Sequence, residues 1–234
     1  MSDNRYLRQM MISEIGVEGQ KRIRNASILI VGLGGLGSPV ALYLTGAGIG
    51  RIGLCDADVV SESNLHRQIL YDASSIGKKK AEVAEKHLTA LSPDTEFEIF
   101  SNGLNIENAS EIIGRYDLVV DCCDNYSTRY LIDDTCFKLG KQWIYGAVGE
   151  LIGQLSVFNA ESGVRYSDLY PDREYFCSLP RNTLGAFGPV PGTIGSLQAA
   201  EAIKQIVGIS SLLDGAMLTF DFLSLSTELI QLGN

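Results

Sequence analysis

A glycine-rich run, GLGGLG at residues 32–37, constrains the fold of this chain more than any other feature. It follows an apolar, β-branched stretch at 27–32 and precedes a small-residue stretch at 36–48, a pattern typical of a buried strand and then a helix. Glycines let the backbone turn tightly and approach a phosphate, and the helix N-terminus then offers free N–H groups. The pattern predicts either a phosphate-binding turn or a tight strand-to-helix connection without a ligand.

An acidic residue, Asp56, supports the first of these alternatives. It lies near the end of a second predicted strand, at 51–58, and 19 residues after Gly37. A carboxylate at this place in a strand–helix–strand unit can accept hydrogen bonds from both ribose hydroxyls of a nucleotide. The sequence therefore predicts an adenine-nucleotide site.

Strands and helices continue to alternate along the chain, which predicts an α/β fold. We expect a Rossmann-like, doubly wound and mainly parallel sheet, followed by antiparallel strands at 153–159 and 218–232. An amphipathic helical arm at 4–24 precedes this core, and an irregular stretch at 160–192 is expected to be functional or mobile. The other predicted strands are 95–102, 117–125 and 142–148, and the other predicted helices are 77–93, 106–114, 127–140 and 196–208.

The length of 234 residues favours one domain. Its expected parts are a helical arm at 1–25, a nucleotide-binding core at 26–150 and a loop with antiparallel strands at 151–234. The net charge of −9 argues against a nucleic-acid partner or an anionic membrane surface, because phosphate neutralisation needs a basic protein surface.

The uncharged stretch at 25–50 is long enough to span a bilayer, but its glycines and its proline favour a strand, a turn and a helix. The N-terminus has no apolar signal core, so we expect a cytoplasmic protein without a membrane partner. The five cysteines are an odd number, which is typical of reduced thiols rather than of a disulfide framework.

Several polar residues point to a triphosphate rather than to NAD. A polar segment follows Asp56, Lys80 begins a predicted helix, and Asp124 ends a predicted strand. The carboxyl ends of strands form the ligand crevice in such sheets, and Mg²⁺ prefers one or two carboxylates together with phosphate oxygens. The alternatives are solvated surface charges and, for Asp124, a cap on the helix near Ser127. A nicotinamide-dependent oxidoreductase is a further, weaker reading.

Taken together, these motifs resemble those of the ThiF/MoeB/HesA family of adenylyltransferases, which are relatives of ubiquitin-activating enzymes. The resemblance covers residues 5–232 and rests on six motifs that occur in the family's order. These are RYLRQ (5–9), VGLGGLGSP (31–39), DADVVSESNLHRQ (56–68), GKKKAE (77–82), DCCDN (121–125) and GSLQAAEAIK (195–204).

The resemblance implies an enzyme that activates the C-terminal glycine of a ubiquitin-like sulfur carrier ending in Gly-Gly, using ATP and Mg²⁺. The carrier carboxylate attacks the α-phosphate, which gives an acyl-adenylate and pyrophosphate. It also implies a homodimer, because Arg8 matches an arginine that the family's arm places in the partner's site. Implied nucleotide contacts are Gly34, Gly35, Gly37, Asp56, Asp58, Asn64, Arg67, Gln68, Lys80 and Asp124. Catalytic roles are implied for Arg8, Arg67, Lys80 and Asp124, the last of which would hold Mg²⁺.

The chain departs from the family at the zinc site. Many members bind zinc through two Cys-x-x-Cys pairs, and this chain has neither, so we expect no zinc. Arg165 and Asp168 stand at the spacing of the first pair. We expect an ion pair between them to replace the metal.

A second departure concerns the cysteine that some members use for a covalent link to the carrier. Arg181 stands at that place, and Cys177 lies four residues away in the same loop. Cys177 is the candidate for this role. The remaining cysteines, which are Cys55, Cys122, Cys123 and Cys136, are expected to be buried small residues.

Compact size favours the thiamine-thiazole branch of the family over the molybdopterin branch. A cysteine desulfurase or another sulfur donor would be a further partner. Two alternatives remain, namely an enzyme that adenylates a tRNA or small-molecule carboxylate, and a noncatalytic binding subunit.

Overall fold

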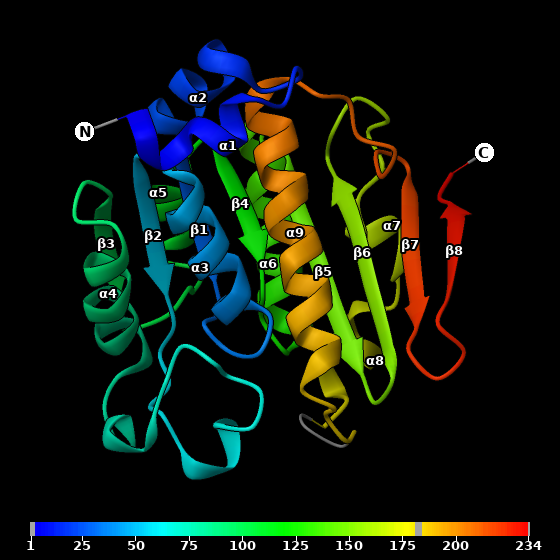
Figure 1. Ribbon diagram of the computed structural model, residues 1–234. Helices are drawn as coiled ribbons and strands as arrows, with labels where there is room; N and C mark the ends of the chain where they lie inside the picture. The colour runs from blue at the N-terminus through cyan, green and yellow to red at the C-terminus, as the bar shows by residue number, and fades with distance from the viewer. Residues whose placement is uncertain (1–2, 181–183, 234) are drawn as a thin grey trace.

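A computed structural model describes residues 3–180 and 184–233, and these residues build one eight-stranded sheet (Figure 1). The strand order is β3-β2-β1-β4-β5-β6-β7-β8, in which β1 to β5 are parallel and the last three strands are antiparallel. This confirms the predicted sheet. The strands are β1 Ser27–Val31, β2 Arg51–Cys55, β3 Glu96–Phe100, β4 Leu118–Asp121, β5 Trp143–Gly149, β6 Ile152–Phe158, β7 Ala216–Asp221 and β8 Ser226–Gln231.

Helices cover both faces of the sheet (Figure 1). Three of them pack with one core cluster in front of the sheet in that view, and four lie behind it with the second cluster. The front helices are α3 Gly37–Ala47, α4 Lys80–Leu91 and α9 Pro189–Val207, and the rear helices are α5 Ala109–Gly114, α6 Tyr126–Leu139, α7 Tyr166–Leu169 and α8 Arg173–Ser178.

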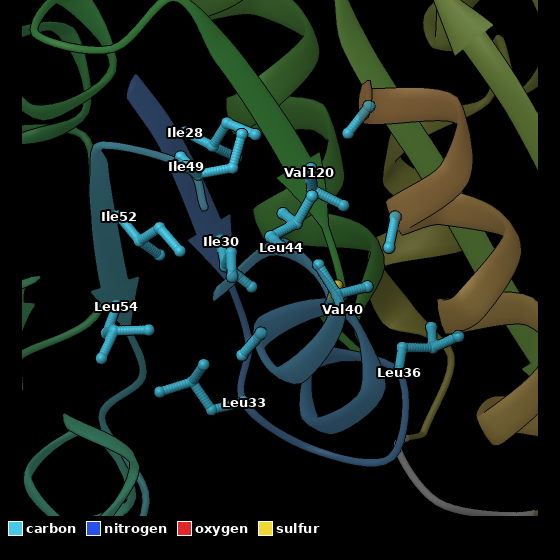
Figure 2. Packing of buried hydrophobic residues seen from close by; sticks show 14 of the residues in the cluster. Ile28, Ile30, Leu33, Leu36, Val40, Leu44, Ile49, Ile52, Leu54 and Val120 are labelled. Carbon is cyan, nitrogen blue, oxygen red and sulfur yellow. The ribbon is translucent and has the colours of Figure 1, made fainter. Parts of the chain in front are cut away.

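Strand β1 is buried on both faces, which explains its uninterrupted apolar sequence. Ile28 and Ile30 belong to the front cluster, whereas Leu29 and Val31 belong to the rear one. Figure 2 shows the front side chains gathered beside α3. Each fully buried side chain of this kind contributes about 1.5–3 kcal/mol, so β1 holds the end of the glycine turn in a rigid place.

The N-terminal arm differs from the single helix that the sequence predicts. It consists of a 3-10 helix, η1 Asp3–Tyr6, and two separate helices, α1 Leu7–Met10 and α2 Gly16–Asn25. Gly16 has φ of +55°, outside the right-handed helical region, which lets the chain change direction there. The arm lies at the end of the sheet where β1, β2 and β4 begin (Figure 1).

The described parts of the irregular stretch, 160–180 and 184–192, contain more helix than the sequence indicates. It contains α7, α8 and the first turn of α9, which begins with Pro189, seven residues before the predicted start. Proline is favoured in the first helical turn, because the N–H it lacks has no intrahelical partner there. The antiparallel segment at 218–232 is a hairpin of two strands, β7 and β8.

Residues 25–50 form β1, the glycine turn and α3, as predicted. Among the described residues, no helix has the length and apolar character needed to cross a membrane.

Candidate functional site

The glycine turn lies between β1 and α3, where the strand order of the sheet reverses. Gly32 has φ of +95°, and a Cβ there would lie 2.5 Å from the carbonyl oxygen of Cys122. A Cβ on Gly37 would lie 2.0 Å from the carbonyl oxygen of Gly32. Both positions therefore require glycine, and the turn packs directly on the end of β4.

The carboxylate of Asp56 fastens the end of β2 to this turn. Its Oδ2 accepts a hydrogen bond from the backbone N–H of Leu33 at 2.7 Å, and its Oδ1 accepts one from Asp58 N–H at 2.8 Å. Burial raises the pKa of Asp56, against the opposing effects of the Lys80 charge and of these two hydrogen bonds. Each carboxylate oxygen has a further lone pair that a hydroxyl donor can use.

The segment at 56–80 folds back along the edge of the sheet where the parallel strands end. It brings two of the predicted cations, Lys80 and Arg67, to that edge. Lys80 is 5% exposed, and its Nζ lies 3.1 Å from Oδ2 of the exposed Asp58. Arg67 is half-buried and donates from Nη1 to the carbonyl of Ser63 at 3.0 Å, with His66 Nε2 at 2.7 Å from the same atom. The half-buried Asn64 accepts the backbone N–H of Gln68 at its carbonyl.

Gln68 lies against the glycine turn. It is 4% exposed, and its Nε2 is the heavy atom nearest to where a Gly34 Cβ would stand, at 3.5 Å. Its Oε1 is buried and has no hydrogen-bond partner among the described residues. A buried amide oxygen without a donor costs free energy, which is recovered when a ligand supplies one.

The first turn of α9 closes the other side of this edge. A Cβ on Gly35 would lie 3.0 Å from Pro191, and one on Gly188 would lie 2.7 Å from the carbonyl of His66. The structure therefore brings Gly34, Gly35, Gly37, Asp56, Asp58, Asn64, Arg67, Gln68 and Lys80 to one edge of the sheet.

Asp124 lies three residues after β4, on the turn that follows this strand. It is exposed, and it makes no hydrogen bond or ion pair with any residue that the structure describes. The N-cap of α6 is Asn125, whose side chain accepts the N–H of Thr128 at 2.9 Å. The helix-capping alternative for Asp124 is therefore wrong, and its carboxylate is available to a ligand.

A buried network holds the turn that carries Asp124, and sequence reasoning missed its members. Asp121 is completely buried and accepts hydrogen bonds from Arg129 Nε at 3.1 Å and from Cys123 N–H at 3.0 Å. Gln198 of α9 donates to the carbonyl of Asp121 at 2.6 Å. The available signal was a charged residue at the end of an apolar strand, with an arginine eight residues later on the apolar face of α6.

A single exposed carboxylate on the turn that follows β4 would suit Mg²⁺, which keeps several waters and takes its other ligands from phosphate oxygens. Across residues 3–180 and 184–233, no three His, Cys, Asp or Glu side chains lie close enough together to hold a metal ion by themselves. Asp124 would therefore share Mg²⁺ with a bound nucleotide.

Arg8 does not join the site of its own chain. It lies on α1, beside the C-terminal end of α3, whereas the glycine turn lies at the N-terminal end of α3 (Figure 1). The 11 residues of α3 span about 16 Å, which exceeds the length of an arginine side chain. Arg8 is exposed and has no hydrogen bond or ion pair within the described part of the chain.

Cys177 is exposed on α8, which packs against α6. The nearby Arg173 donates to Asp134 at 2.8 Å, so its charge is already paired. Arg181 lies outside the described residues. The four other cysteines are buried as predicted, and burial raises the pKa of Cys55 and of Cys136 to about 12.

The predicted ion pair between Arg165 and Asp168 is wrong. The Arg165 guanidinium donates instead to Asp133 at 2.8 Å and to Asp134 at 2.9 Å, both on α6. Asp168 accepts the backbone N–H of Arg165 at 2.9 Å and so closes the start of α7. The loop is still attached by a charge pair, but its partner is α6, because the guanidinium extends away from its own helix.

Comparison with known proteins shows the family of this chain. The family model described as the ThiF family matches residues 6–234. This chain belongs to the ThiF family. The curated relatives of this ThiF-family chain include the sulfur carrier protein adenylyltransferase of Thermus thermophilus, which is 44% identical over 95% of this chain and 84% of the relative.

Two other relatives are longer than this chain. The probable molybdopterin-synthase adenylyltransferase of Porphyra purpurea is 43% identical over 96% of this chain, which spans 59% of it. The adenylyltransferase and sulfurtransferase MOCS3 of Drosophila yakuba is 46% identical over 93% of this chain, which spans 48% of it. The ThiF-family chain thus spans about half the length of these two relatives.

Solved structures of Escherichia coli MccB share the fold. The MccB structure with ATP has a TM-score of 0.86 at 24% identity and covers 99% of this chain and 72% of MccB. At this identity the likeness confirms the fold class of the ThiF-family chain and nothing further.

Proposed function

We propose that this ThiF-family chain is an ATP-dependent adenylyltransferase that activates the C-terminal glycine carboxylate of a ubiquitin-like sulfur carrier protein. The observation that carries the proposal is the meeting of the glycine turn, two cations and an unpaired carboxylate at one edge of the sheet. These charged side chains can neutralise the negative charge of a triphosphate, whereas a nicotinamide ring has no negative charge for them to neutralise. The names of the relatives support the same activity.

Nucleotide binding would use the groups already described. The N–H groups at Gly34, Gly35 and Gly37 would hold phosphate oxygens, and the free lone pairs of Asp56 would accept the ribose hydroxyls. The amine of Lys80, which has one carboxylate partner, has further N–H donors for phosphate oxygens. Asp58, Asn64, Arg67 and Gln68 would complete the lining.

The reaction forms a bond between a carrier carboxylate oxygen and the α-phosphorus, and it breaks the bond from that phosphorus to the oxygen that leaves with pyrophosphate. The carboxylate is already ionised at neutral pH, so no general base is needed. Catalysis then consists of holding the two anions together and neutralising their charge, which is the task of Arg67 and Lys80. Mg²⁺ on Asp124 would neutralise the leaving phosphates.

The site would be completed by a second copy of the chain. Arg8 is separated from its own glycine turn by the length of α3, so it can serve only a neighbouring site. Apolar side chains are exposed around it, and a groove of about 390 Å³ runs between the arm, α3 and α9. Tyr43 lines this groove and is more than half exposed, as are Met11 and Val17 of the arm, which suits burial in a homodimer.

The proposed pathway is thiamine-thiazole biosynthesis in the cytoplasm, with a cysteine desulfurase or another sulfur donor acting after adenylation. A carrier of molybdopterin synthase is the second candidate, favoured by the name of the Porphyra relative. The chain would act as one domain in which the arm at 1–25 and the core at 26–150 build the nucleotide site. Residues 151–234 would receive the carrier.

Carrier-dependent exchange of pyrophosphate into ATP tests the proposal. The purified protein is assayed with a thiamine-type and a molybdopterin-type carrier, each ending in Gly-Gly. We expect exchange with one of them, and loss of exchange in Arg8→Ala and Lys80→Ala. ATP binding without exchange with either carrier would count against the proposal and in favour of another carboxylate substrate or a noncatalytic role.

A further inference from the structure

Two glutamines fasten the arm to the C-terminal end of α3. Gln9 Nε2 donates to the carbonyl of Ala47 at 3.2 Å and to Gln20 Oε1 at 2.6 Å. Gln20 Nε2 donates to the same Ala47 carbonyl at 3.0 Å. Ala47 is the last residue of α3, so its carbonyl has no intrahelical donor. These bonds therefore fix the arm to a helix that begins at the glycine turn.

Arg8 is held between two anchors. On one side, Tyr6 is 2% exposed and its ring lies against Gly48, where a Cβ would be 2.6 Å from the ring. On the other side stands Gln9. The four-residue α1, which follows Tyr6 and contains Gln9, is too short to be stable by itself, so its place depends on these contacts. The backbone of Arg8 is fixed while its side chain is exposed and unpaired within the described residues.

We infer that Gln9 and Gln20 are positioning residues that set Arg8 for the active site of a second copy of this chain. The inference rests on the proposed function and goes beyond it. An arginine lowers the barrier of phosphate chemistry only when its guanidinium is held at the place where charge develops. Loss of the glutamine bonds would free α1 to move and would displace Arg8 from the neighbouring site.

Arg22 provides a matched control for this role. It lies on α2, as Gln20 does, and its Nη1 donates to the carbonyl of Val207 at 2.7 Å, at the C-terminal end of α9. It therefore also anchors the arm to the end of a helix, but it makes no hydrogen bond or ion pair with α1 in the described structure. If the arm had only a structural role, loss of the Gln20 bonds and loss of the Arg22 bond would lower kcat equally.

The first experiment compares pyrophosphate exchange and ATP affinity in Gln20→Leu, Gln9→Ala and Arg22→Ala. We expect kcat to fall about tenfold or more in both glutamine variants, because a small displacement of a catalytic group has an effect of this size. Their Kd for ATP should stay within about twofold of wild type, since the nucleotide is held at the other end of α3. Arg22→Ala should lower Tm and retain kcat.

The second experiment asks in which chain Gln20 acts. Gln20→Leu and Lys80→Ala copies with different tags are co-expressed, and the mixed dimer is purified. If Gln20 acts on the neighbouring site, the mixed dimer has one intact site and about half of wild-type activity. If it acts within its own chain, neither site is intact. Gln9→Ala with Lys80→Ala provides the second pair, in case Gln20→Leu weakens the fold.

An inactive mixed dimer, a failure of the two copies to associate, or an equal loss of kcat in Arg22→Ala would overturn the inference. These results are distinct from failure of the proposed function, which would appear as no exchange in the wild-type protein itself. Wild-type exchange is therefore measured in the same series. Rescue of the glutamine variants by the Lys80→Ala copy supports the inference directly.

Discussion

The carboxylate of Asp121 and the guanidinium of Arg129 form an ion pair at 3.1 Å beneath the turn that carries Asp124. The Asp121 side chain is completely buried, and that of Arg129 is 10% exposed. Arg129 also donates to the carbonyls of Cys123 at 2.9 Å and of Gly146 at 3.3 Å. One cation therefore joins the end of β4 and the middle of β5 to the turn, and the turn depends on it for its shape.

Replacing Arg129 with leucine should destabilise the protein by about 3–5 kcal/mol, because it leaves a buried carboxylate without its cation. Urea unfolding followed by circular dichroism measures this change. Lys21→Ala is the control, since its pair with Glu18 is exposed on both sides and should contribute nothing measurable. A loss in Arg129→Leu no larger than that of the control would show that the pair does not support the turn.

Substitutions at the neighbouring residues Asp124 and Asn125 should have different effects, the first on catalysis and the second on stability. Asp124→Asn should lower kcat/KM for pyrophosphate exchange about a hundredfold and leave Tm unchanged, because the exposed carboxylate makes no hydrogen bond or ion pair with a described residue. Asn125→Ala should retain exchange and lose about 1 kcal/mol of stability, because it removes the N-cap of α6. Exchange kinetics and thermal melts of the two variants measure these effects. If kcat/KM and Tm changed by the same amounts in Asp124→Asn as in Asn125→Ala, the two residues would not have separate roles.

The alternation of strands and helices and the glycine turn could be predicted because they depend on local signals. Apolar runs, turn glycines and helix ends are all visible in the sequence, and Asp56 stands next to its strand. The contact of Gln198 with Asp121 could not be predicted in this way, since the two residues are 77 positions apart and meet only through the packing of α9 on the sheet.

The direction in which a side chain points was the second feature that the sequence could not predict. Arg165 and Asp168 have a spacing that suggests an ion pair, but the guanidinium lies over the ring of Phe137, with 4.2 Å from its central carbon to the ring centroid, and reaches the carboxylates of α6. The placement of Arg8 likewise depends on the break at Gly16, which the amphipathic pattern of the arm conceals. Periodicity predicts which residues share a face, but not which neighbouring element that face meets.

The contact between Arg165 and α6 should hold the segment that contains α7 and α8. Asp133 is completely buried and also accepts the N–H groups of Tyr166 and Ser167, so Arg165→Ala leaves its charge only partly satisfied. We expect a loss of about 2–4 kcal/mol and faster hydrogen–deuterium exchange at 164–178. Arg173→Ala is the control, because that side chain is half exposed and should change exchange little. Unchanged protection in Arg165→Ala would exclude this role.

ATP affinity should depend on pH through Asp56. Burial raises the pKa of this carboxyl above 3.8, so its contribution to folding stability is greatest when it is protonated and is lost as the pH rises through the raised value. ATP binding has the opposite sign, because the ribose hydroxyls need the ionised carboxylate as acceptor. Affinity measured by calorimetry should therefore fall on acidification at a pH above that of an ordinary aspartate. Asp56→Asn should bind ATP weakly without this transition, and a transition that persists in this variant would assign it to another group.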